Sequence, residues 1–496
     1  MKELTDIALN AADSGGATYA DIRISRHRSQ DIWTREERVQ WVENSESYGF
    51  GVRVLVDGTW GFAASHRVTA ENVADVTRRA MAIARANKTV LRKRVELPPV
   101  QKQIDHWQSP IEKDPFKIPI ERKIDLLLRV NAEALKVKGA KFCMSSMRFL
   151  NEEKFFASTA GSLLEQNIYR SWPSFTVTAL DESGAEFETR TVDVPPMGLG
   201  YEFVERADLI GLASKMAEEA VQKLTAKSVE PGKKDIVLHP TNLWLTIHES
   251  VGHPTELDRA LGYEANYAGT SFLTTDKLGK LKLGSPIVNI KADKTIRSGL
   301  ASCGYDDDGV KTSEWHLVKD GVFVDYQTTL EQVSWPEYQA ARKAGGLPPA
   351  DRSYGCSYAD SWASVPFQRM PNIHLEPGKK PLTLEQLIAD TDDGIYIVGD
   401  GSWSIDQQRY NFQFGGQAFF EIKKGKITGM LRDVAYQANS QEFWNACDAI
   451  CDERSWEMGG SFYDGKGEPG QINAVSHGCS PARFRKVNIL NTGKNA

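Results

Sequence analysis

The sequence predicts an α+β protein in two parts, of which the C-terminal part is rich in antiparallel sheet. Helical and strand-like patterns are mixed along the 496 residues. The polar stretch 227–234 contains Pro231-Gly232 and interrupts both periodicities, as a boundary segment does. After this stretch the pattern is mostly strand and turn. We therefore expect an N-terminal α+β domain over 1–228 and a C-terminal domain over 229–496, which carries the motif described below.

The N-terminal part is expected to contain four helices and two hairpins. Apolar residues spaced three and four apart predict the helices, and alternating apolar residues on both sides of a turn predict the hairpins. Thr69 is suited to cap a helix, Pro119 to begin one, and Asp57-Gly58 to form a hairpin turn. The expected helices are 2–12, 69–88, 119–137 and 206–223, and the expected hairpins are 51–62 and 175–192.

The C-terminal part begins with a short strand, 235–239, and a helix, 242–252. Two further hairpins are predicted at 316–324 and 419–427, where apolar residues alternate around a glycine-containing turn. This order indicates that one helix stands among strands, and that helix carries the most informative motif of the chain.

Composition excludes several functional classes. Lys and Arg number 60 against 66 Asp and Glu, a net charge of −6, whereas nucleic-acid-binding surfaces show a basic excess. No apolar run approaches the roughly 18 residues that span a bilayer, and the N-terminus lacks a signal-peptide core. Six cysteines without an export signal favour reduced thiols. We expect a cytoplasmic protein without a nucleic-acid or membrane partner.

The predicted helix 242–252 contains His248-Glu249 and is followed by His253. On the usual zinc-protease helix the histidines are four residues apart and share a face. Five residues at about 100° each would place the two imidazoles about 140° apart on a continuous α-helix. Because Gly252 favours helix ends and Pro254 disfavours a helical His253, we expect the helix to end near Gly252. His253 would then lie on the exit turn and approach His248.

In this arrangement Glu249 faces the open position of a metal, where a general base belongs. Glu256 and Asp258 either orient a ligand imidazole or are solvated loop charges. The competing interpretation of the histidine pair is a helix end with one buried and one capping histidine.

The motif His248-Glu-Ser-Val-Gly-His253 resembles the His-Glu-x-x-x-His motif of the TldD branch, the catalytic branch, of the TldD/PmbA metalloproteases. Further stretches resemble family motifs in the same order: 48–65, 269–272, 305–309, 371–374, 393–396 and 469–471. The resemblance implies a two-domain, zinc-dependent peptidase that cleaves unstructured peptides or leader segments. It also implies a homodimer, or a heterodimer with a related subunit.

The chain departs from the family pattern at the third zinc ligand. Related proteins take this ligand from a cysteine in a Cys-Gly-Lys segment, and the corresponding residues here are Asp464-Gly465-Lys466. A carboxylate is a competent zinc ligand, so Asp464 is the first candidate. Cys479 is the alternative and His477 a third candidate. Loss of a thiolate weakens the preference for zinc over other divalent metals.

The sequence therefore supports a cytoplasmic zinc metallopeptidase in which the metal polarises the scissile carbonyl and Glu249 deprotonates the bound water. A sheet-rich C-terminal part suits a peptide bound as an added strand. The alternative is a non-catalytic peptide-binding subunit of a TldD/PmbA-type protease complex, which the change at Asp464 favours. A metal-dependent amidase acting on a non-peptide amide is a third possibility.

Overall fold

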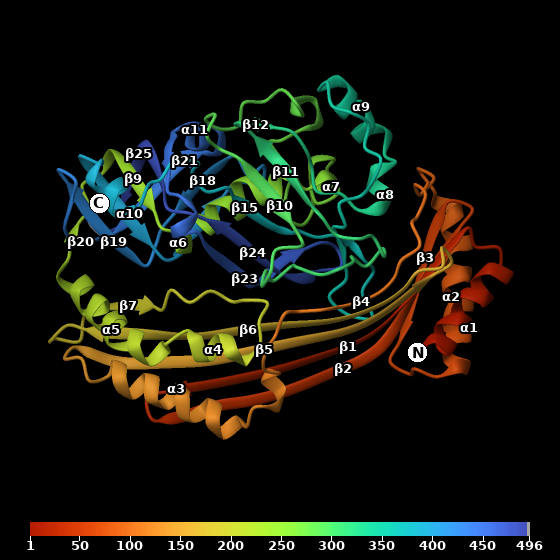
Figure 1. Ribbon diagram of the computed structural model, residues 1–496, viewed down its shortest axis with the longest axis horizontal. Helices are drawn as coiled ribbons and strands as arrows, with labels where there is room; N and C mark the ends of the chain where they lie inside the picture. The colour runs from red at the N-terminus through yellow and green to blue at the C-terminus, as the bar shows by residue number, and fades with distance from the viewer. Residues whose placement is uncertain (494–496) are drawn as a thin grey trace.

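The structure, a computed structural model, describes residues 1–493, and its N-terminal part is built on one long curved sheet (Figure 1). The seven strands follow the order β3-β2-β1-β5-β6-β4, with β7 paired to β6. Four of them, β2, β1, β5 and β6, are long, and each is antiparallel to the next, so they form a ribbon that runs beneath the C-terminal part. The strands are β1 (Tyr19–Arg35), β2 (Arg38–Val56), β3 (Thr59–Ser65), β4 (Ile104–Gln108), β5 (Ala140–Ser158), β6 (Leu163–Leu180) and β7 (Phe187–Thr191).

Two groups of helices pack on this sheet. One core joins α1 and α2 to β1–β3 at one end, and another joins α3 and α5 to β5 and β6 at the other end. Thr69 caps α2, because its hydroxyl accepts the N–H of Asn72 at 3.4 Å. The helices are α1 (Lys2–Ser14), α2 (Ala70–Asn87), α3 (Ile120–Ala134), α4 (Tyr201–Arg206) and α5 (Leu209–Thr225).

The C-terminal part contains a ten-stranded mixed sheet in the order β17-β18-β21-β25-β9-β16-β19-β20-β8, with β22 paired to β25. Most neighbours are antiparallel, but β9 is parallel to β16 and β8 is parallel to β20. The strands are β8 (Lys227–Ser228), β9 (Gly232–Leu238), β16 (Asp393–Val398), β17 (Trp403–Ile405), β18 (Asn411–Phe414), β19 (Ala418–Lys423), β20 (Lys426–Arg432), β21 (Val434–Asn439), β22 (Cys447–Ile450) and β25 (Ala482–Asn491).

Three smaller sheets complete this part. They are β12-β11-β10-β15, β13-β14 and β23-β24. Their strands are β10 (Ile290–Asp293), β11 (Glu314–Lys319), β12 (Val322–Phe323), β13 (Ser357–Tyr358), β14 (Phe367–Gln368), β15 (Asn372–Leu375), β23 (Glu457–Lys466) and β24 (Gln471–Cys479). The helices are α6 (Pro240–Ile247), α7 (Leu257–Ala260), α8 (Leu330–Val333), α9 (Pro336–Ala344), α10 (Leu384–Ala389) and α11 (Ser440–Asn445).

The α+β class is confirmed, and so are the four predicted hairpins and three of the four N-terminal helices. The helix predicted over 206–223 is wrong in its start, because Asp208 adopts a left-handed conformation (φ 44°) that separates α4 from α5. Its carboxylate instead caps α5 by accepting the N–H of Gly211 at 3.2 Å. The division at residue 228 stays a prediction. Among the described residues, no helix combines the length and apolar character needed to cross a bilayer.

Buried ion pairs join the two parts of the chain, and we call this group of residues the seam. The N-terminal sheet contributes Arg53 and Lys154, and the C-terminal part contributes Asp307 and Asp308. Arg53 Nη2 donates to Asp308 Oδ1 and to Asp21 Oδ2, at 2.7 Å in both cases. Lys154 Nζ donates to Asp307 Oδ2 at 3.1 Å. These contacts fix the N-terminal sheet against the C-terminal part, which carries the predicted metal site.

Candidate metal centre

The two motif histidines lie on one widened turn of helix. After α6 the chain forms a π-helical turn, His248–Gly252, in which the N–H of His253 donates to the carbonyl of His248. This bond joins residues five apart, so the fifth residue returns to the face of the first. The π-helical turn ends at Gly252, close to the expected helix end, but the expected departure of His253 from the helix is wrong. His253 itself is helical, with φ −60° and ψ −44°, and begins a 3₁₀ turn. The two imidazoles come together because this turn contains one residue more than an α-helical turn.

Local packing explains how the widened turn is held. A Cβ on Gly252 would lie 2.7 Å from Met370 Sδ, so glycine permits this close approach. Pro254 has no N–H to bond a helix carbonyl. The hydroxyl of Thr255 compensates by donating to the carbonyls of Val251 and Gly252, at 2.7 and 3.0 Å. A proline directly after His253 is thus compatible with a helical His253.

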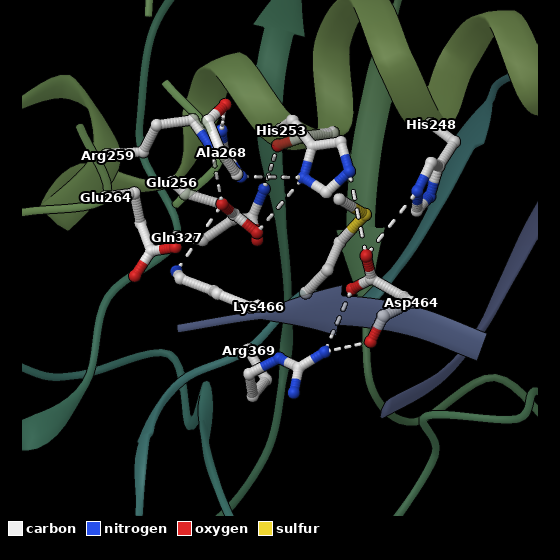
Figure 2. Close-up of polar contacts among 12 residues, drawn as sticks. His248, His253, Glu256, Arg259, Glu264, Ala268, Gln327, Arg369, Asp464 and Lys466 are labelled. Carbon is white, nitrogen blue, oxygen red and sulfur yellow. Dashed lines mark hydrogen bonds and ion pairs between the residues drawn. The ribbon is translucent and has the colours of Figure 1, made fainter. Parts of the chain in front are cut away.

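Asp464 on β23 completes a group of three donors with the two histidines (Figure 2). Its Oδ1 lies 3.7 Å from His248 Nε2 and 3.6 Å from His253 Nε2. The exposed fractions of the three residues are 7%, 4% and 5% for His248, His253 and Asp464. Ligand atoms about 2.1 Å from a tetrahedral zinc are separated by about 3.4 Å, so these separations fit a divalent metal. The chemistry of the set, two imidazoles and one carboxylate, fits as well.

Glu249 lies beside this group. Its carboxylate and the two imidazoles offer ligand atoms that all lie within 4.8 Å of one another. Glu249 Oε2 also accepts from Arg409 Nη1 at 2.6 Å. Burial raises the pKa of Glu249 to about 7, although Arg409 acts in the opposite direction. Glu249 is therefore poised to exchange a proton near neutral pH.

Arg409 was not anticipated from the sequence. It lies between β17 and β18 in a left-handed backbone conformation (φ 63°), and its N–H donates to the Asp406 carbonyl at 2.9 Å. The Asp406 carboxylate accepts the N–H groups of Tyr410 and Asn411. The sequence signal, an Asp and an Asn around Arg409, predicts at most a turn.

Arg369 was also missed. Its guanidinium contacts the carbonyl of Asp464, and its Nη2 lies 3.4 Å from Asp464 Oδ2. Burial raises the pKa of Asp464, and Arg369 opposes that rise. Arg369 follows β14 and no motif surrounds it, so only the fold brings it to Asp464.

Each motif histidine has a second partner on its far ring nitrogen. His248 Nδ1 lies 2.8 Å from His477 Nε2. His253 Nδ1 lies 3.5 Å from Glu256 Oε1 and 3.5 Å from Arg259 Nη2. The other oxygen of Glu256 accepts from Arg259 Nε at 2.9 Å. His477 is thus placed behind His248 rather than beside Asp464.

Of the two interpretations of Glu256 and Asp258, solvated loop charges are excluded, since both residues are buried. Lys466 Nζ contacts Glu256 Oε2 at 3.4 Å (Figure 2). It also donates to Asp258 Oδ1 at 2.9 Å. Burial favours a raised pKa for Glu256, but Lys466 and Arg259 outweigh it and hold that pKa well below its usual range. Glu256 therefore stays anionic beside His253.

Cys479, the alternative third ligand, lies elsewhere. Its fully buried thiol points to the carbonyl of Pro240, with Sγ 3.9 Å from that oxygen. Burial raises the pKa of the Cys479 thiol well above its usual value, which opposes the thiolate form that metals bind.

The donor group opens into a cleft of about 490 Å³ between the two parts of the chain. Trp172 on β6 and the segment 191–196 after it line one wall, and β23 residues line the other. β23 pairs only with β24, so among the described residues its second edge has no strand partner. Trp403 and Tyr463, which are 61% and 51% exposed, add aromatic surface.

Comparison with known proteins adds a family assignment for most of the chain. Residues 231–490 match the PmbA/TldA metallopeptidase C-terminal domain, residues 20–84 match domain 1, and residues 113–227 match the central domain. The C-terminal match alone covers over half of the chain.

Relatives match over nearly their whole length. A metalloprotease of Methanothermobacter thermautotrophicus is 28% identical, with 96% of each chain covered. A zinc metalloprotease TldD homolog of Saccharolobus solfataricus is 21% identical, with 97% of this chain and 98% of that protein covered.

Solved structures share the fold. TM0727 of Thermotoga maritima matches with a TM-score of 0.74 at 16% identity, covering 99% of this chain and 100% of that one. TldE of Thermococcus kodakarensis matches with a TM-score of 0.69 at 16% identity, covering 99% of each chain.

Proposed function

Since this chain belongs to the PmbA/TldD metallopeptidase family, we propose that it is a zinc-dependent peptidase that cleaves unstructured peptides or leader segments. The observation that carries the proposal is the convergence of His248 Nε2, His253 Nε2 and Asp464 Oδ1 beside Glu249. We assign the first three residues as metal ligands and Glu249 as the catalytic base. The position of Cys479 against Pro240 supports Asp464 over Cys479.

A zinc ion bound by these residues would supply a Lewis acid that polarises the scissile carbonyl and acidifies a water. Glu249 lines the same cleft, accepts a proton from the attacking water and returns it to the leaving amine. Burial raises the pKa of Glu249, which makes its carboxylate a stronger base. Arg409 keeps the carboxylate directed by its contact with Oε2.

The free edge of β23 supports an extended substrate. Gly459, Gly460 and Ser461 line the cleft beside Asp464, on the edge that no other described strand pairs with. A peptide added along this edge would be bound through its backbone, which gives affinity without a strict sequence requirement. Folded proteins keep their backbone hydrogen bonds internal, so this mode selects unstructured segments. The homodimer or heterodimer implied by the family resemblance stays a prediction.

The test is a metal analysis of untagged protein by elemental mass spectrometry, combined with cleavage assays on an unstructured peptide. We expect about one zinc per chain in the wild type and in Cys479→Ala, and loss of both metal and cleavage in Asp464→Ala. A folded protein substrate serves as the negative control. Wild-type protein without metal after incubation with zinc would contradict the proposal, and metal loss confined to Cys479→Ala would reassign the third ligand.

A further inference from the structure

We propose that His477 is a positioning residue that fixes the tautomer of His248 and thereby directs the His248 Nε2 lone pair at the metal position. The proposal rests on the proposed function for the role of His248 as a ligand. The tautomer of His248 follows from two consecutive hydrogen bonds, from His248 to His477 and from His477 to the backbone carbonyl of Ile373.

The first bond sets the protonation of His477. Its Nδ1 lies 3.0 Å from the carbonyl oxygen of Ile373 on β15. A carbonyl oxygen only accepts, so His477 Nδ1 carries the hydrogen. His477 is fully buried, and no carboxylate of residues 1–493 lies within ion-pair distance of it. A buried cation without a counter-charge is costly, so the ring is neutral and its Nε2 carries a lone pair.

The second bond transmits this choice to His248. His477 Nε2 and His248 Nδ1 are 2.8 Å apart, so His248 Nδ1 must be the donor. A neutral His248 that carries its hydrogen on Nδ1 has a lone pair on Nε2. That nitrogen is the atom that faces Asp464 Oδ1 at 3.7 Å.

The reverse arrangement fails at both ends. If His477 Nε2 donated to His248 Nδ1, a neutral His477 would direct a lone pair at the Ile373 carbonyl. The hydrogen of His248 would then lie on Nε2, where it would block a metal. Only one assignment of hydrogens satisfies both observed contacts of His477.

Packing holds His477 in place. Its ring stacks on Trp244 of α6, with centroids 6.0 Å apart and planes 8° apart. Trp244 also packs closely against β23, because a Cβ on Gly459 would lie 2.3 Å from its ring. Gly459 is also the residue of β23 that pairs with His477 on β24. The imidazole therefore has little freedom to turn away from His248.

The two motif histidines consequently have unlike partners. Glu256, an anionic carboxylate, lies behind His253, whereas a neutral imidazole lies behind His248. Carboxylates and backbone carbonyls are the usual acceptors behind metal-bound histidines. Here the His477 ring lies between His248 and the Ile373 carbonyl. It accepts the hydrogen of His248 Nδ1, as a backbone carbonyl would if it were bonded to His248 directly.

The first test compares zinc affinity, measured by competition with a chelator, in wild type, His477→Leu and His477→Gln. Leu lacks an acceptor, and we expect its affinity to fall about 10- to 100-fold. Gln offers an oxygen to His248 and N–H groups to Ile373, so most of the affinity should return. His374→Leu is the matched control, because His374 on β15 has no hydrogen bond to either motif histidine among the described residues. Equal losses in Leu and Gln, with wild-type thermal unfolding, would reduce His477 to a packing role and overturn the proposal.

The second test reads the tautomer directly, by NMR of metal-free protein labelled with nitrogen-15 histidine. We expect His248 to carry its hydrogen on Nδ1 in the wild type and to lose this preference in His477→Leu. An Nε2–H tautomer in the wild type would overturn the inference. Failure of the wild type to bind zinc would instead defeat the proposed function, and the tautomer measurement would still decide the role of His477.

Discussion

Buried pairs of arginine or lysine with carboxylates occur in two regions of this protein, the seam and the metal centre. In the seam, the carboxylates of Asp307 and Asp308 contact cations and backbone N–H groups. At the centre, Asp464 and Glu256 also have cationic partners, but each faces an imidazole of the motif as well. In the seam, carboxylate charge is balanced by cations. At the centre, the imidazole and carboxylate donor atoms also converge on the proposed metal position.

Ion pairs of the same kind therefore stabilise the fold in the seam and position reacting groups at the proposed metal centre. Loss of one partner in the seam leaves an uncompensated buried charge, which is strongly destabilising. Loss of the proposed proton acceptor at the centre should leave the fold intact and remove a step of the reaction. The two regions should therefore respond separately to mutation.

The largest expected effect is at the centre. Glu249→Gln keeps an oxygen for Arg409 but cannot accept a proton, so kcat should fall about 10²- to 10⁴-fold. Zinc content and thermal unfolding should stay near wild-type values, since neither the ligands nor the seam is changed. Steady-state cleavage of an unstructured peptide measures the effect, and retained turnover would remove Glu249 from the mechanism.

The next effect is in the seam. Arg53→Met leaves Asp21 and Asp308 buried without their cation, which should lower the free energy of unfolding by about 3–5 kcal/mol. Activity per folded molecule should be unchanged. Urea unfolding measures the loss. Arg26→Met on the neighbouring strand β1 is the control, because its pair with Glu46 is exposed and should contribute about 0–1 kcal/mol. Equal losses of unfolding free energy in Arg53→Met and Arg26→Met would show that the buried pairs of the seam contribute no more than an exposed pair.

The smallest effect is a shift in pH dependence. Burial raises the pKa of Glu249 to about 7 and Arg409 lowers it, so the base is lost as pH falls through this range. Bound zinc adds positive charge, which moves the acidic limb of kcat/KM below pH 7. Arg409→Met removes a cation, so the limb should move to higher pH, and kcat/KM profiles of the two proteins measure the shift. A limb displaced to lower pH would show that Arg409 acts other than through Glu249.

Much of the fold follows from local patterns. The turn at Asp57-Gly58 has positive φ at both residues, 52° and 80°, as its sequence predicts for a tight hairpin. The cap at Thr69 is equally local. The lengths of β1, β2, β5 and β6 were not predicted, because their polar stretches carry no alternation and are fixed by neighbouring strands.

The candidate site was predictable where the motif itself supplied it. His248, Glu249 and His253 lie in one short segment of the sequence, whereas Asp464 was found only through the family resemblance. The π turn was missed. Single-residue preferences at Gly252 and Pro254 favour a helix end, whereas the local hydrogen bonds of the Thr255 hydroxyl and the packing of Gly252 against Met370 favour continuation. Arg369 and Arg409 come from irregular segments whose positions only the assembled fold determines.

The donors that meet in Figure 2 are made at very different times during synthesis of the chain. His248 and His253 leave the ribosome long before β23 and β24, which carry Asp464 and His477. A nascent chain, or a fragment that stops before β23, thus has the histidine motif without its third donor or the partner of His248. If Asp464 is a metal ligand, as proposed, the site stays one ligand short until β23 has been made.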